Sequence, residues 1–512
     1  MPATLLEMFE QLVEGGWKRS FTQARVFERV RRLTFGMLVS LRLHLTSQAI
    51  CATGRQFQDW SADYRVCSHS PWDPHRLFDP VLDALPGLLP DPKSPVLVAL
   101  DDTLLHKTGR KIPGVTIGRD PMSPPFHVNL CYGLRFVQTS VLVYPRAGKG
   151  GAARALPVRF ELAPPAVKPK RRAKSQDTSK TAELAAATGD GQPVKPVLST
   201  EEIAYKEEKK RKRLPQVGLN SIFSLRRSMD ARAELRDRPL IVSGDGSYTN
   251  KLVIQGLPDN TIYIGRIRKD AKLYWPLPNQ SSHGPGRPRR YGPVAPTPEQ
   301  ILKDDTLPWT QVSCFAAGEF RQIPVKVIGP IYWRNAGVDR PLLLVVIKPL
   351  GYRSRKGGKL QYRQPAFLIC TDPTLSLELL VQAYVYRWEI ECNHRDEKSL
   401  LGVGQGQVRN PEAVRRLPQL QVASYSLLLL ASLLSSGFQR GEEYLPLPKW
   451  RRTTPSHRPS LLDMLNLLRD EVFARNVRLP VVSFEDFLKH APDCVKSSKL
   501  PLSAENQCTL AA

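Results

Sequence analysis

Two short apolar runs, each leading to an aspartate, constrain the fold of this 512-residue chain more than any other feature. The first, PVLVAL at residues 95–100, ends directly at Asp101, and the second, at residues 240–242, leads to Asp245. Continuous apolar runs of this length are typical of central strands that are covered on both faces. We therefore expect an α/β fold in which helices cover a sheet containing both strands.

The N-terminal region, residues 1–90, has amphipathic spacing and clustered arginines, which predict helices. Within it, residues 46–66 have the pattern of two short helices around Thr53 and Gly54. This pattern fits a DNA-reading helix-turn-helix, and it also fits an ordinary helical hairpin.

Further strand patterns follow both aspartates. Residues 126–134 and 135–145 predict a hairpin or meander after the first aspartate, and residues 261–269 predict a strand after the second. From about 270 to 375 the pattern is mainly β with basic loops, and from Ser376 it becomes helical.

The chain is strongly basic, with a formal net charge of +26. Residues 166–213 are rich in Pro, Ala, Lys and Thr, and predict a disordered linker that passes into a charged helix near Thr200. This linker contributes +6, so +20 remains on the other parts of the chain. Such an excess of cations favours nucleic acid as the partner.

The cysteines favour a reducing cytosol as the compartment, and the hydropathy argues against a membrane span. The eight cysteines form no C-x-x-C pair and no Cys/His grouping with zinc-site spacing. The uncharged stretch 417–439 has its compact apolar part at 422–434, which is shorter than the ~20 residues that a membrane span needs. We expect a buried helix there and no membrane partner.

The most specific signal lies in the helical stretch AYVYRWEIECNHRDEKSLLG. On a continuous helix, an arc of about 60° would contain Tyr384, Arg387, Glu391 and Lys398. Trp388 and Arg395 would lie within about 40° on the other side of this arc. A carboxylate framed by cations and aromatics suits a metal-binding glutamate whose neighbours hold DNA phosphates and a displaced base. The alternative is a surface helix with an Arg387–Glu391 salt bridge, and geometry alone leaves both readings open.

Three carboxylates brought together by a fold suit hard divalent cations, which prefer oxygen ligands. Asp101, Asp245 and Glu391 are the candidates in this sequence. Two Mg²⁺ ions about 3.5–4 Å apart can activate water and stabilise the leaving 3′ oxygen in phosphodiester cleavage. A strand-end aspartate by itself is weak evidence, because aspartate also caps and turns chains there.

The spacing Y-x2-R-x3-E-x6-K, matched at all four positions, resembles the signature of bacterial insertion-sequence transposases with an RNase H-like DDE catalytic core. LVALDDT and LIVSGDGSY resemble the two aspartate strands of that family, and GRIRKDAKLYWP followed by GPGRPRRYG resembles its basic segment. ICTDPTLSLELLVQAYVYRWEIE and LGVGQGQVRN resemble the entry to the glutamate helix and the exit from it. The resemblance covers residues 95–440, approximately.

The resemblance implies that Asp101, Asp245 and Glu391 bind the catalytic metal, expected as two Mg²⁺ ions for which Mn²⁺ substitutes. Asp101 is preferred to Asp102 because it directly ends the apolar run. Contacts to the transposon-end DNA backbone or a flipped base are expected from Tyr384, Arg387, Trp388, Arg395 and Lys398.

Two basic segments are further candidates for DNA contacts. Residues 265–272 and 286–290 are rich in cations, and Gly286-Arg287-Pro288 resembles the core of a minor-groove hook, which makes Arg287 and Arg289 candidates. The alternative is a solvated loop. Residues 351–363 contain five cations and no acid, which fits a phosphate-contacting loop or a soluble hairpin tip.

The resemblance predicts a DNA transposase, at least dimeric on paired transposon ends, in the bacterial cytoplasm at the nucleoid. Metal-activated water would cleave double-stranded DNA at the ends, and the new 3′-OH would attack target DNA. The alternatives are a non-mobile nuclease with the same core and a catalytically inactive, transposase-derived DNA-binding protein.

The expected division is a helical DNA-binding domain (1–90), the first half of an RNase H-like core (91–165), a disordered basic linker (166–213), the second part of the core (214–269), a β-rich insert (270–375), the catalytic Glu helix with closure of the core (376–440), and a C-terminal helical region and tail (441–512).

Overall fold

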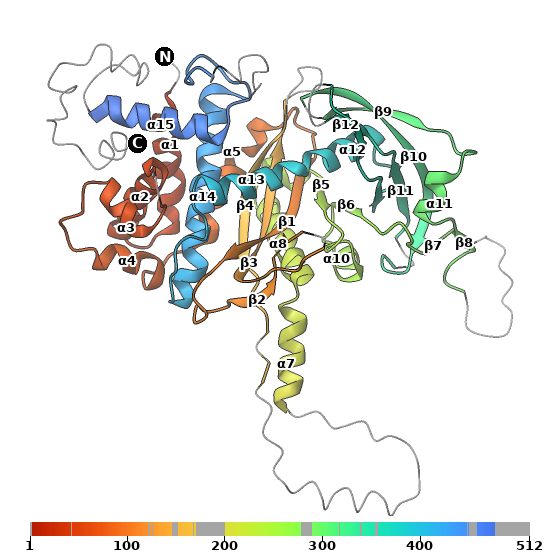
Figure 1. Cartoon of the computed structure of the whole chain (residues 1–512), viewed down its shortest axis with the longest axis horizontal. Helices are drawn as coiled ribbons and strands as arrows, with labels where there is room; N and C mark the ends of the chain where they lie inside the picture. The colour runs from red at the N-terminus through yellow and green to blue at the C-terminus, as the bar shows by residue number, and fades with distance from the viewer. Residues whose placement is uncertain are drawn as a thin grey trace, which may run out of the picture.

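The computed structural model places helices on both faces of one large mixed sheet (Figure 1). It describes residues 3–476, apart from 42, 121–122, 125, 146–151, 167, 170–199, 278–288, 317, 338–339, 354–356, 448 and 450–457. Most of the linker expected at 166–213, and the tail after residue 476, therefore lie outside the described residues.

Within this described part, twelve strands form the sheet, in the order β2-β3-β1-β5-β6-β14-β11-β10-β7-β8, with β4 paired to β3 and β9 paired to β10. Their bounds are β1 (Val96–His106), β2 (Thr116–Arg119), β3 (Leu130–Val143), β4 (Arg154–Leu162), β5 (Leu240–Gly244), β6 (Thr261–Arg266), β7 (Leu273–Tyr274), β8 (Val294–Ala295), β9 (Thr310–Ala316), β10 (Glu319–Trp333), β11 (Leu342–Ile347) and β14 (Ala366–Cys370). A separate two-stranded sheet contains β12 (Gly351–Arg353) and β13 (Leu360–Tyr362).

The helices are α1 (Leu5–Leu12), α2 (Ala24–Val39), α3 (Thr46–Ala52), α4 (Ser61–Ser68), α5 (Asp79–Leu88), α7 (Thr200–Arg211), α8 (Leu214–Asp230), α9 (Ala233–Arg236), α10 (Lys251–Gln255), α11 (Pro298–Lys303), α12 (Leu377–Tyr386), α13 (Trp388–Ser399), α14 (Pro411–Ser436) and α15 (Leu461–Asn476). Short π and 3-10 turns join the N-terminal helices. The charged helix expected near Thr200 is α7, which projects from the rest of the fold in Figure 1.

The two apolar runs form the neighbouring parallel strands β1 and β5, as predicted. β5 is buried throughout, and a second parallel pairing joins it to β6. Alternate residues of β1 enter two different hydrophobic cores: Val98 packs in the core that also contains α8 and α14, while Ala99 packs in the core that contains α12. Burial on both faces explains why the sequence is continuously apolar rather than alternating.

The region after the first aspartate differs from the predicted hairpin. Residues 130–143 form one strand, β3, that pairs antiparallel with β1 along its length, so the expected turn near residue 134 is wrong. Gly133 lies opposite His106 in the ladder rather than in a turn. β1 also continues past Asp101 to His106, and the partner strand β4 was not predicted. The extent of β3 is determined by its pairing with β1, which a local sequence pattern does not report.

Residues 270–375 are rich in strands, as expected from their pattern. These strands continue the sheet of the two aspartate strands, because β14 pairs antiparallel with β6. Gln382 of α12 fastens this half of the sheet by accepting a hydrogen bond from the Phe315 amide at 2.8 Å and donating one to the Phe315 carbonyl at 3.1 Å.

The uncharged stretch forms most of α14, which lies between the N-terminal helices and the sheet (Figure 1). Gln419 donates a hydrogen bond to the Phe160 carbonyl of β4 at 2.9 Å, and Arg416 donates one to the Ser70 carbonyl at 2.8 Å. Among the residues that the structure describes, α14 is the one helix long and apolar enough to span a membrane, but 94% of its most apolar window is buried inside the protein. The prediction of a buried helix is confirmed.

The N-terminal region is helical, as predicted, but its two short helices do not have the spacing of a helix-turn-helix. α3 ends at Ala52 and α4 begins at Ser61, and Gly54 between them has a positive φ of 71°. The connection, residues 53–60, is longer than the three to four residues of a helix-turn-helix turn. The helical-hairpin alternative therefore describes this segment better.

Candidate active site

The two strand-end aspartates lie side by side. In the parallel ladder between β1 and β5, Leu100 is the partner of Gly244, and Asp101 and Asp245 are the next residues of their chains. Neighbouring strands lie about 4.8 Å apart. The pairing of two strands separated by 144 residues thus brings the two carboxylates side by side at the carboxyl end of β5.

The third carboxylate, that of Glu391, lies in α13, which is separated from α12 by a break in the helix. α12 ends at Tyr386 and α13 begins at Trp388, with Arg387 between them. Arg387 Nη1 donates to Asp101 Oδ2 at 3.3 Å, and Arg387 Nη2 donates to Glu391 Oε1 at 2.9 Å. One guanidinium therefore joins the glutamate helix to the first aspartate strand.

The expected single long helix across this region is replaced by these two helices, so Tyr384 does not share one helical arc with Glu391. Tyr384 is half-buried in α12, and it contributes to the raised pKa of the Arg387 guanidinium. The salt bridge between Arg387 and Glu391, expected for a plain surface helix, is present, but Arg387 also reaches Asp101. The arrangement is therefore more than a solvated helix face.

Electrostatics within the cluster favour a bound cation. Burial raises the pKa of Asp101 to about 7, an effect that Arg387 opposes and that Asp245 and Asp102 reinforce. Burial also raises the pKa of Asp102, and Asp245 adds to this, while Arg135 opposes it. Crowded carboxylates that repel one another supply the oxygen ligands that divalent cations prefer. The residues present therefore fit a divalent metal.

Asp101 and Asp102 have different partners, since consecutive strand residues point to opposite faces. Asp101 faces Arg387, whereas Asp102 accepts a hydrogen bond from Arg135 Nη1 at 2.6 Å and one from the Tyr248 hydroxyl at 3.3 Å. Sequence reasoning missed both residues: Arg135 because the pairing of β1 with β3 was not foreseen, and Tyr248 because its contact depends on how the segment after β5 packs against β1. These contacts favour Asp101 over Asp102 as the metal ligand.

The remaining candidate residues lie at different distances from this cluster. Burial lowers the pKa of Lys398, an effect that the carboxylates of Glu397, Asp120 and Asp102 oppose. Trp388 is 60% exposed, and the exposed Arg395 forms an ion pair with Asp396 at 2.9 Å. Arg289 is exposed at the end of a described segment, and Arg287 lies outside the described residues.

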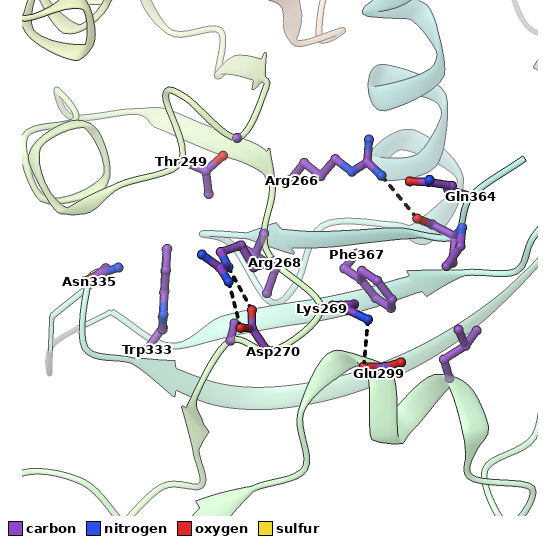
Figure 2. Close-up of a pocket in the computed structure, with 15 residues that line it drawn as sticks. Thr249, Arg266, Arg268, Lys269, Asp270, Glu299, Trp333, Asn335, Gln364 and Phe367 are labelled. Atoms are coloured by element: carbon purple, nitrogen blue, oxygen red, sulfur yellow. Dashed lines mark hydrogen bonds and ion pairs between the residues drawn. The ribbon is translucent and has the colours of Figure 1, made fainter. Parts of the chain in front are cut away.

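A cavity of about 970 Å³, shown in Figure 2, is lined in part by Gly246, the residue after Asp245. Gly246 and Thr249, just beyond that aspartate, form part of its wall, and Arg266 lines it from β6. Two other basic side chains of the expected segment 265–272 line the cavity as ion pairs, Arg268 with Asp270 at 2.9 Å and Lys269 with Glu299 at 3.4 Å.

The cavity lining also includes Trp333, Asn335 and Phe367, which sequence reasoning did not select. Trp333 and Phe367 lie in strands and Asn335 follows one, and nothing else in the sequence around them points to a site. Aromatic residues in strands more often belong to the buried core. The sequence therefore gave no reason to place them beside the second aspartate.

The chain was also compared with known proteins. The model of the DDE superfamily endonuclease family matches residues 20–326, which is more than half of the chain. The match includes both strand-end aspartates, and Glu391 lies beyond its end. A search of curated proteins found no match. Nucleases of this superfamily use divalent metals and act on DNA. From the extent of the match, this chain belongs to the DDE superfamily endonucleases.

Proposed function

We propose that this DDE superfamily endonuclease is a transposase that cleaves DNA at transposon ends and joins the ends to target DNA. The observation that supports this most is the Arg387 guanidinium, which bonds both Asp101 and Glu391 while Asp245 lies on the neighbouring strand. The Arg and Glu of the Y-R-E-K spacing, which resembles that of insertion-sequence transposases, thus lie in one polar cluster with Asp101.

The sheet topology supports an RNase H-like core in this proposal. β4, β3 and β1 are successive antiparallel neighbours, and β5 and β6 continue in parallel from β1. We propose that residues 91–165, 214–269 and 376–440 form this core and that residues 270–375 are an insert. Such an insert extends the core sheet instead of forming a separate one.

In this mechanism, Asp101, Asp245 and Glu391 would hold two Mg²⁺ ions, for which Mn²⁺ would substitute. When bound, these ions would supply an activated water and stabilise the leaving 3′ oxygen. Arg387 fixes the Glu391 carboxylate relative to β1, and the half-buried position of the cluster excludes part of the bulk water. This pre-orientation of the acids reduces the reorganisation needed during the reaction.

DNA would lie along α13 and the cavity beside Asp245. We assign phosphate contacts to Lys398 and Arg395, and stacking on a displaced base to the exposed Trp388. Tyr384 would orient Arg387, and the 286–290 segment with Arg287 and Arg289 would reach a minor groove. A homodimer on paired ends, in the bacterial cytoplasm, completes the proposal.

Strand transfer distinguishes a transposase from its alternatives. The full chain is incubated with a pre-cut DNA end from the sequence flanking its own gene, a supercoiled target plasmid and Mg²⁺. A transposase joins the 3′-OH of the end to the plasmid, a non-mobile nuclease cuts DNA without joining, and an inactive DNA-binding descendant only shifts the DNA in a gel. Glu391→Gln serves as the matched control, and cutting without joining would contradict the proposal.

A further inference from the structure

A second group of metal-ligating side chains lies outside the carboxylate cluster. The nearest ligand atoms of His106, Asp120 and Cys131 all lie within 4.8 Å of one another. His106 Nε2 and Asp120 Oδ1 are 3.7 Å apart. These residues come from β1, from the end of β2 and from β3, so the sequence spacing did not reveal them.

The sheet register explains why all three side chains share one face. Cys131 is the ladder partner of Gly118, and Asp120 lies two residues beyond Gly118, so both point to the same side. The Asp120 amide continues this ladder by donating to the Asn129 carbonyl at 2.9 Å.

His106 joins the same face from the opposite edge of β3. It is the ladder partner of Gly133, which lies two residues beyond Cys131. Because Gly133 has no side chain, nothing of that residue separates the imidazole from the thiol. The side chains of His106, Asp120 and Cys131 therefore lie on the same face of the sheet, over β3.

The chemistry of this group differs from that of the carboxylate cluster. A thiolate, an imidazole and a carboxylate form the ligand set of Zn²⁺ or Co²⁺, whereas Mg²⁺ prefers oxygen alone. In a tetrahedral zinc site, ligand atoms lie roughly 3.3–3.8 Å apart, which the 3.7 Å pair already meets. Movement of the Cys131 side chain by about 1 Å would complete the geometry.

The group is open to ions from solution and is separate from the triad. His106 is exposed, and Asp120 and Cys131 are half-buried. Along β1, His106 lies four residues beyond Asp102, about 13 Å at the usual rise of a strand. A single ion cannot serve both groups.

We propose that His106, Asp120 and Cys131 form a Zn²⁺ site in which water is the fourth ligand. This site would hold the β2–β3 hairpin against the end of β1. β2 has four residues, all exposed, and among the described strands it is hydrogen-bonded to β3 alone. A metal that joins β1, β2 and β3 would compensate for this small buried surface. The site does not depend on the proposed strand-transfer activity.

Cobalt spectroscopy on the reduced, chelator-treated full chain tests this site. One equivalent of Co²⁺ should produce a thiolate-to-cobalt charge-transfer band in the near ultraviolet, which Zn²⁺ abolishes and a large excess of Mg²⁺ does not. Cys131→Ser should lack the band, and His106→Ala should lower the Co²⁺ affinity by at least about tenfold, the lower limit for losing even an outer-shell partner.

Two controls keep the test specific. Cys51→Ser removes a half-buried thiol in α3 and should keep the band, as should Glu391→Gln, which alters only the triad. Zn²⁺ should raise the melting temperature of the wild type but not of Cys131→Ser, whose circular dichroism checks that it is folded. No thiolate band in the wild type, or an unchanged band in Cys131→Ser, would overturn the proposal.

Discussion

At the scale of single residues, Arg387 has the largest role in the candidate site. It lies between two helices, its side chain is 15% exposed, and it donates to two carboxylates from different parts of the chain. The sequence predicted its bond to Glu391 from the i, i+4 spacing. Its bond to Asp101 could not be predicted, because that contact depends on how α13 packs on β1.

Replacing Arg387 with methionine keeps much of its volume but removes both bonds. A hydrogen bond to a charged group contributes about 1.5–3 kcal/mol, which corresponds to roughly 10–100-fold in rate. We expect Arg387→Met to slow DNA cleavage at saturating DNA by at least about tenfold. Single-turnover cleavage assays measure this, and a rate equal to the wild type would show that Arg387 does not position Glu391.

Glu397 is a second residue with a strong environmental effect. Burial raises its pKa to about 8, although Gln138 and Lys398 oppose this. The unfolded chain releases this proton near the ordinary glutamate value, so the folded state holds more protons between that value and pH 8. Stability must therefore fall as the pH rises through this range, and it must level off above about 8.

Glu397→Gln should remove this pH dependence, because glutamine has a similar shape and does not ionise. We expect its melting temperature to fall less than that of the wild type between pH 6 and pH 8. Thermal melts at a series of pH values test this. Parallel curves for the two proteins would mean that Glu397 is ionised throughout this range in the folded state.

At the scale of elements, the sequence predicted β1 and β5, the strands that lead to the two aspartates. It did not predict β3 as one strand, which lies between β1 and β2 in the sheet. Continuous apolar runs identified β1 and β5 because both faces of each strand are buried. The sequence predicted two strands, at 126–134 and 135–145, where the fold has the single strand β3. In the fold Gly133, Leu134 and Arg135 are extended, and Arg135 bonds Asp102.

Close packing at the end of β6 supports the position of Asp245. A Cβ atom on Gly265 would lie 2.2 Å from Thr249 Oγ1 and 2.5 Å from Tyr263 Cε1. Overpacking of this kind costs about 1–3 kcal/mol. Gly265→Ala should therefore lower the free energy of unfolding by that amount and also slow cleavage, because Thr249 bonds the Asp245 carbonyl at 2.8 Å.

Gly87 in α5 is the matched control, since a Cβ atom there meets nothing within 4 Å. Urea unfolding should find Gly87→Ala as stable as the wild type or slightly more stable, because alanine is the better helix former. If Gly265→Ala were equally stable, the packing behind the second aspartate would be looser than described.

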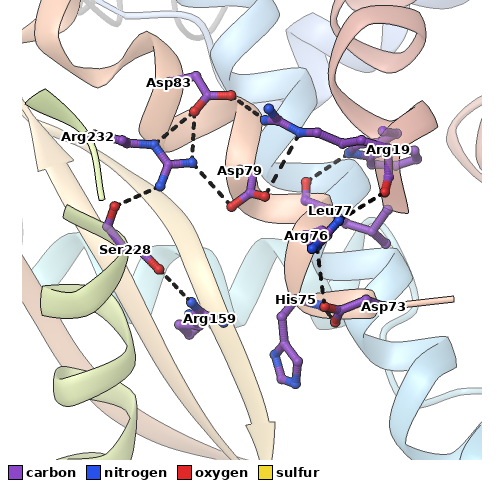
Figure 3. Close-up of polar contacts among 11 residues, drawn as sticks. Arg19, Asp73, His75, Arg76, Leu77, Asp79, Asp83, Arg159, Ser228 and Arg232 are labelled. Atoms are coloured by element: carbon purple, nitrogen blue, oxygen red, sulfur yellow. Dashed lines mark hydrogen bonds and ion pairs between the residues drawn. The ribbon is translucent and has the colours of Figure 1, made fainter. Parts of the chain in front are cut away.

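At the scale of the whole molecule, the N-terminal helices are fastened to the core by a polar network (Figure 3). Arg232, after α8, donates to Asp83 of α5 at 2.8 Å and to Asp79 at 3.3 Å, and Arg19 pairs with both aspartates. Composition predicted a basic protein but not this docking, because contacts between distant helices have no local pattern. The N-terminal region is therefore placed to act together with the core.

The net charge predicts a strong dependence of DNA binding on salt, to which Lys398 should contribute. Each phosphate contact adds about one to the slope of log affinity against log salt concentration. Lys398→Ala should therefore reduce that slope by about one and weaken binding similarly for all DNA sequences. Lys93→Ala is the control, because Lys93 is exposed before β1, at the end of that strand away from Asp101. Equal slopes for the two variants would place Lys398 away from DNA.

The central claim is that Asp101, Asp245 and Glu391 act as one catalytic unit. The most direct measurement compares DNA cleavage and end binding for Asp101→Asn, Asp245→Asn and Glu391→Gln with those of the wild type, in Mg²⁺ and in Mn²⁺. We expect each variant to bind DNA ends with near wild-type affinity, and we expect none of them to cleave the ends. Normal cleavage by any one of the three would contradict the central claim.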